Sequence, residues 1–434
     1  MASEGARPAI FGPSPPLRGT VRVPGDKSIS HRALICAAMA VGRSRIAGLS
    51  EGEDVRATAR ALAAMGVRIG RGGEAWTVDG VGPGALLQPE AALDMANSGT
   101  SARLLMGLAA AHPITATFIG DSSLSRRPME RVAAPLRRLC AEVSANGRLP
   151  LTVRGLCPAV PRTHLMEVPS AQVKSALLLA ALNIPGVTRI VEPVPTRDHS
   201  ERLLELFGAD IRIEGEEIVL RGEAALKPRT LAIPGDPSAA AFLAVAALIV
   251  PGSELRIEGV GINPLRTGLY DLLRAMGGDL AFENARGADG EPVADLLVRH
   301  SPLTAVDVPP EIAPRMIDEF PILFVAAAFA DGVTRTSGLG ELRLKESDRL
   351  AAMAEGLRAI GAKVEETQDG LAIAGTGGEP LEGGATIDPC LDHRIAMSFA
   401  VAGLHGRAPL TVADMNCADT SFPGFASILA GLAS

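Results

Sequence analysis

The sequence predicts an α/β protein with two domains, each made of three units of about 70 residues that combine strands with two helices. Three observations support this prediction. The chain has 434 residues, too many for one ordinary hydrophobic core. An apolar helix end followed by glycine and a β-like segment recurs along the chain. Two related Pro-Gly-Asp segments, VPGDKSISHRAL and AIPGDPSAAAF, each precede an apolar helix and mark crossings between the domains.

The recurring helix end is seen in LAAMGVRI, LRRLCAEV, LELFGADI, LRAMGGDL and LRAIGAKV. Its glycine, replaced once by cysteine, tolerates the left-handed backbone that ends many helices. Breaks such as IPGVTRI and VPGSELRI introduce strands. A sixth copy, LAGL, is expected near the end of the chain. The six positions are Gly66, Cys140, Gly208, Gly277, Gly361 and Gly431.

The two Pro-Gly-Asp segments set the expected domain boundaries. The N-terminal domain is expected to cover 23–234, and the C-terminal domain to combine 1–22 with 235–434. The hinges are then expected near 21–25 and 233–237. Two domains of three units are a simpler packing than a solenoid, whose common periods are shorter.

The composition indicates a packed globular protein. Hydrophobic residues make up 47% of the chain and aromatic residues 3%, so small side chains are expected to fill the cores. The longest apolar run, 239–250, is well short of the ~20 residues of a membrane-spanning helix, so no membrane partner is expected. A net charge of −7 argues against a nucleic-acid partner, which would favour a basic domain.

The cysteines and the N-terminus bear on the cellular location. The cysteines form no CxxC pair and no regular spacing, which predicts a reduced, cytoplasmic protein without a structural metal. The segment MASEGARPAIFGPSPPLRG lacks the apolar stretch of a signal peptide and is expected to be a loose lead-in. The five cysteines are Cys36, Cys140, Cys157, Cys390 and Cys417.

The first polar motif is PGDKSISHR, at 24–32. The apolar run that follows predicts a helix with Lys27 and Ser28 at or before its first turn. The free N–H groups and the positive dipole end of a helix N-terminus favour a bound anion. The alternative is a capped helix with solvated charges. A nucleotide P-loop is excluded, because Asp26 precedes the lysine and Thr20 stands where the first glycine belongs.

The second motif, MANSGTSAR, repeats this design. Asn97 and Gly99 precede a helix that carries Arg103. Gly99 would let a ligand approach the backbone closely. An ordinary Asn/Ser helix cap is the alternative explanation.

The third motif, SRRPMERVAAPL, places three arginines around a helix start. Arg126, Arg127 and Arg131 flank Pro128, which is expected at the first helical position. Cations at a helix N-terminus oppose the dipole and are unfavourable for stability there. This placement therefore favours a role in anion binding.

Two further motifs complete the first half of the chain. SAQVKSALLLAAL places Ser170, Gln172 and Lys174 at a helix start, and TRDHSERLLELFG adds Arg197 and His199. Taken alone, His199 is expected to be a surface or capping histidine.

The second half supplies carboxylates. In PRMIDEFPILFVAAAFA, Asp318 and Glu319 stand directly before an apolar run, where desolvation raises the pKa of a carboxylate and lets it act as a base. RLKESDRLAAMAEGL places Lys345, Glu346 and Arg349 at a helix start, with a salt-bridged surface turn as the alternative.

The helix starts share one property. A last motif, DPCLDHRIAMSFAVAGL, adds Arg394, so that six or more helix starts carry polar, mostly cationic groups. If the helices of each domain point their N-termini one way, these groups converge on one cleft suited to substrates with several negative charges. No Ser-His-Asp order, zinc-ligand spacing or Rossmann glycine pattern competes with this interpretation.

Together these motifs resemble the 5-enolpyruvylshikimate-3-phosphate (EPSP) synthase family, the 3-phosphoshikimate 1-carboxyvinyltransferases. The resemblance runs from Leu17 to Leu432. It implies an α/β fold of two domains, each of three βαβαββ units in the inverted α/β barrel of enolpyruvyl transferases. The segments that carry it, in the family's order, are PGDKSISHR, NSGTSAR, RRPM, SAQVKSALLLA, RDHSE, MIDEFPIL, LRLKESDRL and DHRIAMSF.

The resemblance also implies a reaction. The enolpyruvyl group of phosphoenolpyruvate is transferred to the 5-hydroxyl of shikimate 3-phosphate, and phosphate is released, in the shikimate pathway to chorismate and the aromatic amino acids. The reaction proceeds by addition through a tetrahedral intermediate, followed by elimination. No cofactor and no metal are implied. The implied partners are the two small-molecule substrates and the inhibitor glyphosate, and the protein is expected to be a cytoplasmic monomer.

Residues for shikimate 3-phosphate are carried over from the family by matching position. Arg197 is expected to meet its phosphate, and Lys27 to be shared between both substrates. Ala171 stands where many relatives have a second serine, so one contact is expected to be lost. The implied set is Lys27, Ser28, Arg32, Ser170, Ala171, Gln172, Arg197, Asp318 and Lys345.

Residues for phosphoenolpyruvate and for catalysis follow in the same way. Asp318 is expected to be the base for the 5-hydroxyl, Glu346 to exchange a proton with the methylene carbon, and Lys27 to assist. The arginines are expected on the carboxylate and phosphate of phosphoenolpyruvate. Its implied ligands are Lys27, Asn97, Gly99, Arg127, Gln172, Arg349 and Arg394.

The sequence departs from the family pattern at some positions. Thr420 precedes SFP where many relatives have lysine before TFP, which removes one expected phosphoenolpyruvate contact. The usual GNAGT reads ANSGT, with Asn97 and Gly99 retained. RDHSE and SAQVK resemble the bacterial subgroup known for glyphosate tolerance, which is associated with alanine at the Gly99 position. Because Gly99 is retained here, glyphosate is expected to compete with phosphoenolpyruvate.

Two other functions are alternatives to that of the EPSP synthase family. The UDP-N-acetylglucosamine enolpyruvyl transferases share the fold and the donor, but typically carry a reactive cysteine in a loop near residue 115, where this chain has none. The nearest, Cys140, lies at an expected helix end. A non-catalytic repeat protein that binds anions would not need Asp318 or Glu346.

Overall fold

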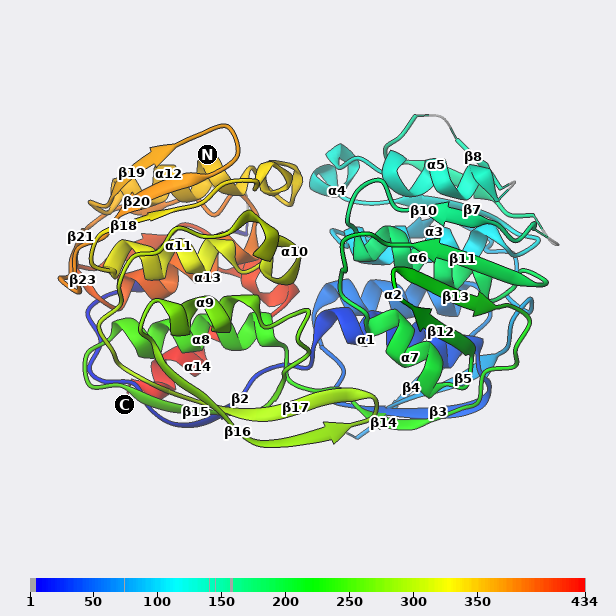
Figure 1. The fold of residues 1–434 in the computed structure, drawn as a ribbon, viewed down its shortest axis with the longest axis horizontal. Coiled ribbons are helices and arrows are strands. Elements are labelled where there is room, and N and C mark those ends of the chain that lie inside the picture. The colour runs from blue at the N-terminus through cyan, green and yellow to red at the C-terminus, as the bar shows by residue number, and fades with distance from the viewer. Residues whose placement is uncertain (1–4, 74, 140, 145, 157–158, 434) are drawn as a thin grey trace. The chain divides into compact units, whose positions relative to one another are not determined.

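The chain forms two compact units in the computed structural model, which describes all residues except 1–4, 74, 140, 145, 157–158 and 434 (Figure 1). Unit 1 consists of Met1–Pro24, Pro234–Arg286 and Pro292–Ser434. Unit 2 consists of Gly25–Ile233 and Gly287–Glu291. Each unit has its own hydrophobic core.

Unit 2 contains three four-stranded sheets built on one plan, ordered β14–β3–β5–β4, β6–β7–β9–β8 and β10–β11–β13–β12. In each sheet the first two strands pair in parallel, and the last two form an antiparallel hairpin. The strands are β3 (Val41–Ala47), β4 (Arg68–Gly72), β5 (Ala75–Val81), β6 (Leu93–Asp94), β7 (Thr115–Ile119), β8 (Glu142–Val143), β9 (Leu151–Arg154), β10 (Thr163–Leu165), β11 (Val187–Val191), β12 (Asp210–Glu214), β13 (Glu217–Arg221) and β14 (Thr230–Ala232).

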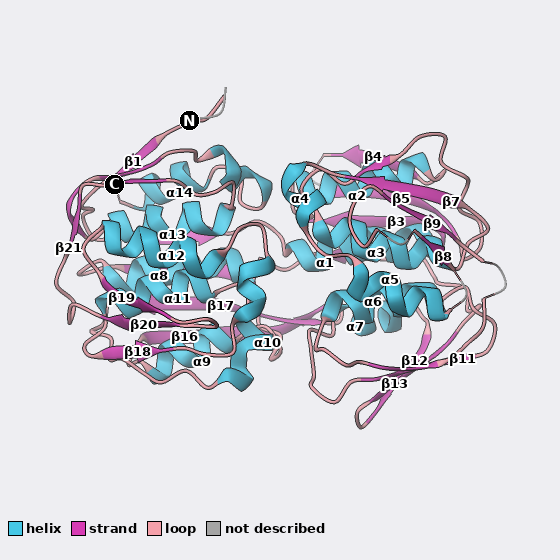
Figure 2. Ribbon diagram, turned by 90° about the horizontal axis from the view of Figure 1, so that it is seen from above, coloured by secondary structure: helices cyan, strands magenta, loops and turns pink. Residues whose placement is uncertain are grey.

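The helices of unit 2 lie between these sheets, with the strands around them (Figure 2). α1, α3 and α6 are buried on almost every side, which their alanine-rich, small side chains permit. α3 and α6 are especially close, because a Cβ at Gly107 would lie 2.2 Å from the backbone oxygen of Ala176. The helices are α1 (Lys27–Met39), α2 (Glu53–Ala64), α3 (Gly99–Ala110), α4 (Ser122–Arg126), α5 (Glu130–Arg138), α6 (Ala171–Ala181) and α7 (His199–Leu206).

Unit 1 repeats the plan less regularly. One sheet, β2–β15–β17–β16, matches those of unit 2, whereas the others are β18–β20–β19, β1–β24–β22 and β21–β23. The strands are β1 (Ala9–Phe11), β2 (Arg18–Arg22), β15 (Glu254–Gly261), β16 (Asp279–Ala288), β17 (Glu291–Arg299), β18 (Val333–Arg335), β19 (Lys363–Glu366), β20 (Leu371–Ala374), β21 (Leu381–Gly383), β22 (Thr386–Ile387), β23 (Gly406–Ala408) and β24 (Leu410–Val412).

The core of unit 1 is built around fully buried apolar helices. Every residue of α8 and α11 is buried. The α-helices are α8 (Pro237–Ile249), α9 (Gly268–Ala275), α10 (Ala313–Met316), α11 (Phe320–Phe329), α12 (Arg349–Ala359), α13 (His393–Gly403) and α14 (Phe425–Leu432). The 3-10 helices are η1 (Pro310–Ile312), η2 (Gly340–Leu344) and η3 (Asn416–Thr420).

The element order confirms an α/β fold made of repeats. The runs β6–α3–β7–α5–β8–β9 and β10–α6–β11–α7–β12–β13 are βαβαββ units, the first with α4 inserted before α5. Four of the recurring glycines end helices with φ between +90° and +94°, as a left-handed helix terminator requires. They are Gly66, Gly208, Gly277 and Gly361. Cys140, the second of the six repeat positions, lies outside the described residues.

Two expectations are wrong. Gly431 lies inside α14 and does not end it, because the helix continues to Leu432. The N-terminal segment is not simply loose, since Ala9–Phe11 pairs antiparallel with β24.

The tip of the β16–β17 hairpin, Gly287–Glu291, belongs to unit 2, although we expected 235–434 to stay in one domain. The physical reason is polar contact: Asp289 Oδ2 accepts a hydrogen bond from the Ala232 N–H at 2.8 Å, and Glu291 pairs with buried His199. Among the residues described, no helix is long and apolar enough to cross a membrane.

Candidate active site

Three helices of unit 2 begin with the same kind of cap. Asp26, Ser98 and Ser170 are the N-caps of α1, α3 and α6, and each side chain accepts a hydrogen bond from the backbone N–H three residues later. Such a cap satisfies one of the N–H groups that a helix start leaves without an intrahelical partner. The expected ligands of these three helix starts lie at or beside the caps: Lys27, Ser28, Arg32, Asn97, Gly99, Ser170 and Gln172. We call those residues, with Arg127 and Arg197, the unit 2 cluster.

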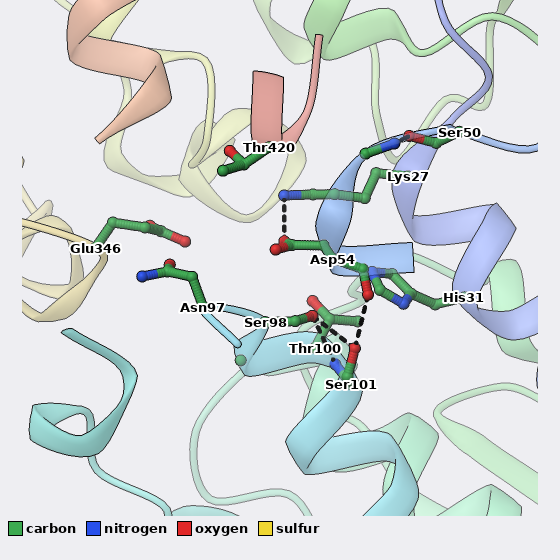
Figure 3. A network of polar contacts seen from close by, with 12 residues as sticks. Lys27, His31, Ser50, Asp54, Asn97, Ser98, Thr100, Ser101, Glu346 and Thr420 are labelled. Atoms are coloured by element: carbon green, nitrogen blue, oxygen red, sulfur yellow. Dashed lines mark hydrogen bonds and ion pairs between the residues drawn. The ribbon is translucent and has the colours of Figure 1, made fainter. Parts of the chain in front are cut away.

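Hydrogen bonds and an ion pair join the starts of α1, α2 and α3 (Figure 3). Lys27 Nζ lies 3.1 Å from Asp54 Oδ2, in the first turn of α2. Ser101 Oγ lies 3.1 Å from the backbone oxygen of Asp54 and 2.7 Å from Thr58 Oγ1, which in turn lies 2.8 Å from His31 Nδ1. These contacts fix Lys27 relative to the first turn of α3.

The starts of α3 and α6 are joined in the same way. Arg103 Nη1 donates to Gln172 Oε1 at 2.9 Å, and Gln172 Nε2 donates to Thr100 Oγ1 at 3.0 Å. Arg127 Nη2 donates to Asn97 Oδ1, just before α3. Four of the expected phosphoenolpyruvate ligands therefore lie around the start of α3, namely Asn97, Gly99, Arg127 and Gln172.

Gly99 is the first residue of α3 and has little free space around it. A Cβ at this position would lie 2.7 Å from Arg103 Nη1 and 3.2 Å from Arg127 Nη1. Glycine therefore leaves both guanidinium groups in place at the start of α3.

Arg32, in α1, is buried against α6 and α7. Its Nε donates to Ser200 Oγ at 2.7 Å, and its Nη2 donates to Ser175 Oγ at 2.6 Å. Burial lowers the pKa of Arg32 to about 10; the charge of Glu201 opposes this shift and that of Arg197 adds to it. Arg32 and Arg197, both expected to meet shikimate 3-phosphate, are therefore close enough to repel, and an anion held by both would relieve that repulsion.

Lys174 is buried within unit 2 and is not grouped with the expected ligands. Its Nζ lies 2.8 Å from both Glu192 Oε2 and Glu201 Oε1. The start of α6 therefore carries two different features, a first turn with the expected ligands Ser170 and Gln172 and a buried ion pair behind it.

In unit 1, Arg349 is the centre of a second group, which we call the unit 1 cluster. The guanidinium is buried and lies 2.8 Å from Asp392 Oδ2, 2.6 Å from Glu346 Oε2 and 3.4 Å from Asp318 Oδ1. Burial alone would lower the pKa of Arg349, but these three carboxylates raise it well above its usual value. The cluster also includes Glu319, Lys345 and Arg394.

Asp318 lies between cations at the start of the apolar helix α11. Lys345 Nζ is 3.7 Å from its Oδ1, and Lys345 also pairs with Glu341 at 3.1 Å. Arg349 Nη1 lies 3.4 Å from the same Asp318 oxygen, so two cations stand beside this carboxylate. The salt bridges of the alternative interpretation are therefore present around Lys345, and one of them joins it to the candidate base Asp318.

Arg394 lies in the first turn of α13. Its Nη1 donates to the backbone oxygen of Asp318 at 2.7 Å and lies 3.6 Å from Glu319 Oε1. Glu319 also accepts a hydrogen bond from Ser238 Oγ, at the start of α8. The starts of α8, α11, α12 and α13 therefore meet within unit 1.

Two local expectations are wrong. Pro128 is not the first helical residue, because α5 begins at Glu130 after the N-cap Met129. Arg126 instead ends the short helix α4, where a cation suits the dipole. His199 is not a surface residue: it is buried at the start of α7, and its Nδ1 lies 2.6 Å from Glu291 Oε1.

Some residues of the two clusters had not been singled out. Asp54 and Asp392 hold Lys27 and Arg349, respectively. A signal existed for both: Asp54 stands in the first turn of a helix in SEGEDVRATARAL, and Asp392 opens the DHR segment. Ser200, which holds Arg32, was part of the TRDHSERLLELFG motif, whereas Ser175, its second partner, gave no signal, because serine is common near helix starts.

The cysteines are distributed over the chain. Cys36, Cys390 and Cys417 are free thiols, whereas Cys140 and Cys157 lie outside the described residues. Within the described part of the chain, no group of three or more His, Cys, Asp or Glu side chains is arranged to hold a metal ion.

Comparison with known proteins places this geometry in a family. Residues 12–429 match the family model described as EPSP synthase (3-phosphoshikimate 1-carboxyvinyltransferase). A protein of that name from Sphingopyxis alaskensis is 60% identical over 100% of both chains, and one from Novosphingobium aromaticivorans is 58% identical over 98% of both.

Solved structures agree with the sequence matches. EPSP synthase from Acinetobacter baumannii has a TM-score of 0.87 and 43% identity, over 98% of each chain. The enolpyruvyl transferase NikO from Streptomyces tendae shares the fold, with a TM-score of 0.78 over 98% of each chain at 19% identity. The eight motifs, the repeated fold and the matches over nearly the whole length lead to one conclusion: the chain belongs to the EPSP synthase family.

Proposed function

We propose that this chain catalyses the reaction of its family with the residues of the unit 2 and unit 1 clusters. As a family member it is a transferase of the shikimate pathway, acting on small molecules. The enolpyruvyl group of phosphoenolpyruvate moves to the 5-hydroxyl of shikimate 3-phosphate, and phosphate leaves. The observation that carries the proposal is the setting of Asp318, with Arg349 and Lys345 at 3.4 and 3.7 Å.

Shikimate 3-phosphate is assigned mainly to the unit 2 cluster. Arg197 binds its phosphate, and the helix starts of α1 and α6 supply further donors. The mutual repulsion of Arg32 and Arg197 supports an anion at this place. The full set is Lys27, Ser28, Arg32, Ser170, Ala171, Gln172 and Arg197 with Asp318 and Lys345 of the unit 1 cluster.

Phosphoenolpyruvate is assigned to residues of both clusters. The arginines bind its carboxylate and phosphate, as bidentate donors suited to both groups. The close approach of Arg103 and Arg127 to Gly99 supports a ligand site at the start of α3. The full set is Lys27, Asn97, Gly99, Arg127, Gln172, Arg349 and Arg394.

Proton transfers are assigned to two carboxylates. Asp318 takes the proton of the 5-hydroxyl, which is a poor nucleophile until it is deprotonated. Glu346 gives a proton to the methylene carbon during addition and takes one back during elimination. Lys27 and the arginines stabilise the charged tetrahedral intermediate.

Substitution of these carboxylates tests the assignment. Asp318→Asn and Glu346→Gln should each lower turnover by about 10²- to 10⁴-fold, because general acid–base catalysis is worth about that much. Binding of shikimate 3-phosphate should persist. The measurement is phosphate release from phosphoenolpyruvate, with shikimate 3-phosphate or UDP-N-acetylglucosamine as the acceptor.

The exposed Asp331, replaced in Asp331→Asn, is the matched control in unit 1. Turnover near the wild-type value in both active-site variants would refute the two roles. Turnover with the UDP-sugar alone would refute the assigned substrate.

Glyphosate is proposed to compete with phosphoenolpyruvate, because Gly99 carries no methyl group that would crowd it. Steady-state inhibition should raise the KM of phosphoenolpyruvate and leave kcat unchanged. Rates that millimolar glyphosate leaves unaffected would contradict this. The protein is further proposed to be a monomer, which sedimentation of the active enzyme would test. It is also proposed to work in the cytoplasm and without a cofactor.

A further inference from the structure

Lys174 is one of the largest side chains that unit 2 buries almost completely, with 1% of its surface exposed. Its Nζ donates to three acceptors: Glu192 Oε2 at 2.8 Å, Glu201 Oε1 at 2.8 Å and the backbone oxygen of Thr196 at 3.1 Å. A lysine ammonium group has three N–H donors, so these acceptors engage all of them. Complete pairing of this kind is what offsets the cost of removing the charge from water.

The three acceptors bracket one loop. Glu192 follows the last residue of β11, Thr196 directly precedes Arg197, and Glu201 lies in the first turn of α7. Thr196 Oγ1 also donates to Glu192 Oε1. The segment from 192 to 198 is therefore attached to α6 on both sides of Arg197, through a single nitrogen atom.

The residue next to Lys174 contacts Arg32, another expected ligand of shikimate 3-phosphate. Ser175 Oγ accepts from Arg32 Nη2 at 2.6 Å and from Ser200 Oγ at 2.7 Å. Two consecutive residues of α6 thus divide the task. Ser175 holds Arg32 directly, and Lys174 holds Arg197 through its loop. The two arginines influence one another, because the charge of Arg197 lowers the pKa of Arg32. The charge of Glu201, a partner of Lys174, raises it.

We propose that Lys174 is a positioning residue for shikimate 3-phosphate, holding the 192–198 loop so that Arg197 meets the phosphate. The inference rests on the proposed function, and it adds a residue that does not itself touch the substrate. It predicts a selective defect. Loss of the ammonium group frees the loop, so binding of shikimate 3-phosphate suffers, whereas the proton transfers of Asp318 and Glu346 do not.

The first test is Lys174→Met, which keeps the aliphatic stem but removes the charge. Titration calorimetry should show the Kd of shikimate 3-phosphate raised by about tenfold or more, equivalent to about 1.4 kcal/mol. The kcat and the KM of phosphoenolpyruvate should stay within about threefold of wild type. Lys227→Met, which removes an exposed lysine of the same unit, should leave every one of these quantities unchanged.

A double-mutant cycle with Arg197→Ala tests whether Lys174 acts through Arg197. The two substitutions should be non-additive, so that Lys174→Met weakens binding much less when Arg197 is already absent. Additive effects on the Kd would overturn the proposal. So would a folded Lys174→Met protein that binds shikimate 3-phosphate as tightly as wild type.

Lys174→Met leaves two buried carboxylates without their cation and could fail to fold. The triple variant Lys174→Met, Glu192→Gln, Glu201→Gln removes the charges together, so it separates folding from positioning. It should fold and still show the raised Kd. Hydrogen exchange of the 192–198 amides should accelerate in either variant without any ligand, and unchanged exchange would overturn the proposal.

This set of measurements also separates two kinds of failure. If the wild-type protein neither binds shikimate 3-phosphate nor releases phosphate, the proposed function is wrong, while the exchange data still decide whether Lys174 holds the loop. If Arg197→Ala weakens binding and Lys174→Met does not, the function stands and the role of Lys174 is wrong.

Discussion

His31 illustrates how a single side chain depends on its surroundings. It is buried one helix turn from Lys27 and next to Arg32, and its Nδ1 lies 2.8 Å from Thr58 Oγ1. Burial lowers the pKa of His31 well below its usual value, and the charges of Lys27 and Arg32 lower it further. The ring is therefore neutral in the folded protein, and it joins α1 to α2 without adding a further positive charge.

This neutrality predicts a pH dependence of stability. In the unfolded chain His31 takes up a proton below about pH 6.5, whereas in the folded chain it does not. The free energy of unfolding should therefore fall as the pH drops, by about 2 kcal/mol between pH 7 and pH 5 from this residue alone. Above pH 7 its contribution should be constant.

His31→Asn should remove that part of the pH dependence. Urea unfolding followed by the fluorescence of Trp76 is a suitable measurement, because the chain has one tryptophan and it lies in unit 2. The readout is the difference between wild type and variant at pH 7 compared with pH 5, in which constant packing effects cancel. An equal pH dependence in both proteins would contradict the assignment.

At the scale of elements, the contact between α3 and α6 determines how two parts of the unit 2 cluster meet. Gly107 lets the helices approach until a side chain would touch the backbone of Ala176. The same approach brings Arg103 of α3 to within 2.9 Å of Gln172 of α6. Core packing and site geometry are thus fixed by one helix pair.

A methyl group at this contact should therefore be costly. Gly107→Ala would place Cβ 2.2 Å from a backbone oxygen that cannot turn away, so the helices must separate. We expect a loss of about 1–3 kcal/mol in the free energy of unfolding, as for other overpacked cores, measured through Trp76. Gly72→Ala is the control, since its Cβ would meet nothing within 4 Å, and it should change stability by less than about 0.5 kcal/mol. Equal stabilities would show that the contact is looser than described.

At the scale of the whole molecule, the chain passes between the two units four times. Beyond the crossings at 24–25 and 233–234, the tip of the β16–β17 hairpin enters and leaves unit 2 at 286–287 and 291–292. Glu291 pairs with His199 in the interior of unit 2, and both side chains are almost completely buried. A segment distant in sequence is therefore part of the core beside α7.

Glu291→Gln should lower the stability of unit 2, although strands of unit 1 flank the substitution. Replacing the charged partner of a buried histidine should cost about 1–3 kcal/mol in the Trp76 unfolding transition. Glu258→Gln removes an exposed ion pair of the same sheet and should have little effect. A Trp76 transition unchanged by Glu291→Gln would mean that the hairpin tip contributes nothing to unit 2.

Local sequence signals predicted much of the fold. The glycines at helix ends and the capped helix starts are short-range features, so Gly66 and Ser98 could be interpreted without knowledge of the tertiary structure. The same signals failed where a longer-range contact decides the outcome. His199 looked like a surface residue because its partner, Glu291, lies 92 residues away. The LAGL segment imitated a helix end because nothing local shows that α14 extends to Leu432.

The candidate site was predictable to a similar extent. Cations at helix starts were visible in the sequence, whereas their pairing with carboxylates and hydroxyls was not, since most of these partners come from other elements. Asp54 for Lys27 and Glu192 for Lys174 are examples. Those partners depend on how helices pack, which no local pattern specifies.

The scarcity of lysine, taken together with where the five lysines lie, makes the protein suited to chemical footprinting. Lys227 and Lys363 are exposed, whereas Lys174 is hidden. Lys27 and Lys345, with 16% and 22% of their side chains exposed, lie one in each cluster. An amine-acylating reagent should modify the two exposed lysines at once and those two slowly. Peptide masses collected with and without each substrate would then report, independently for each cluster, which of them the substrate covers.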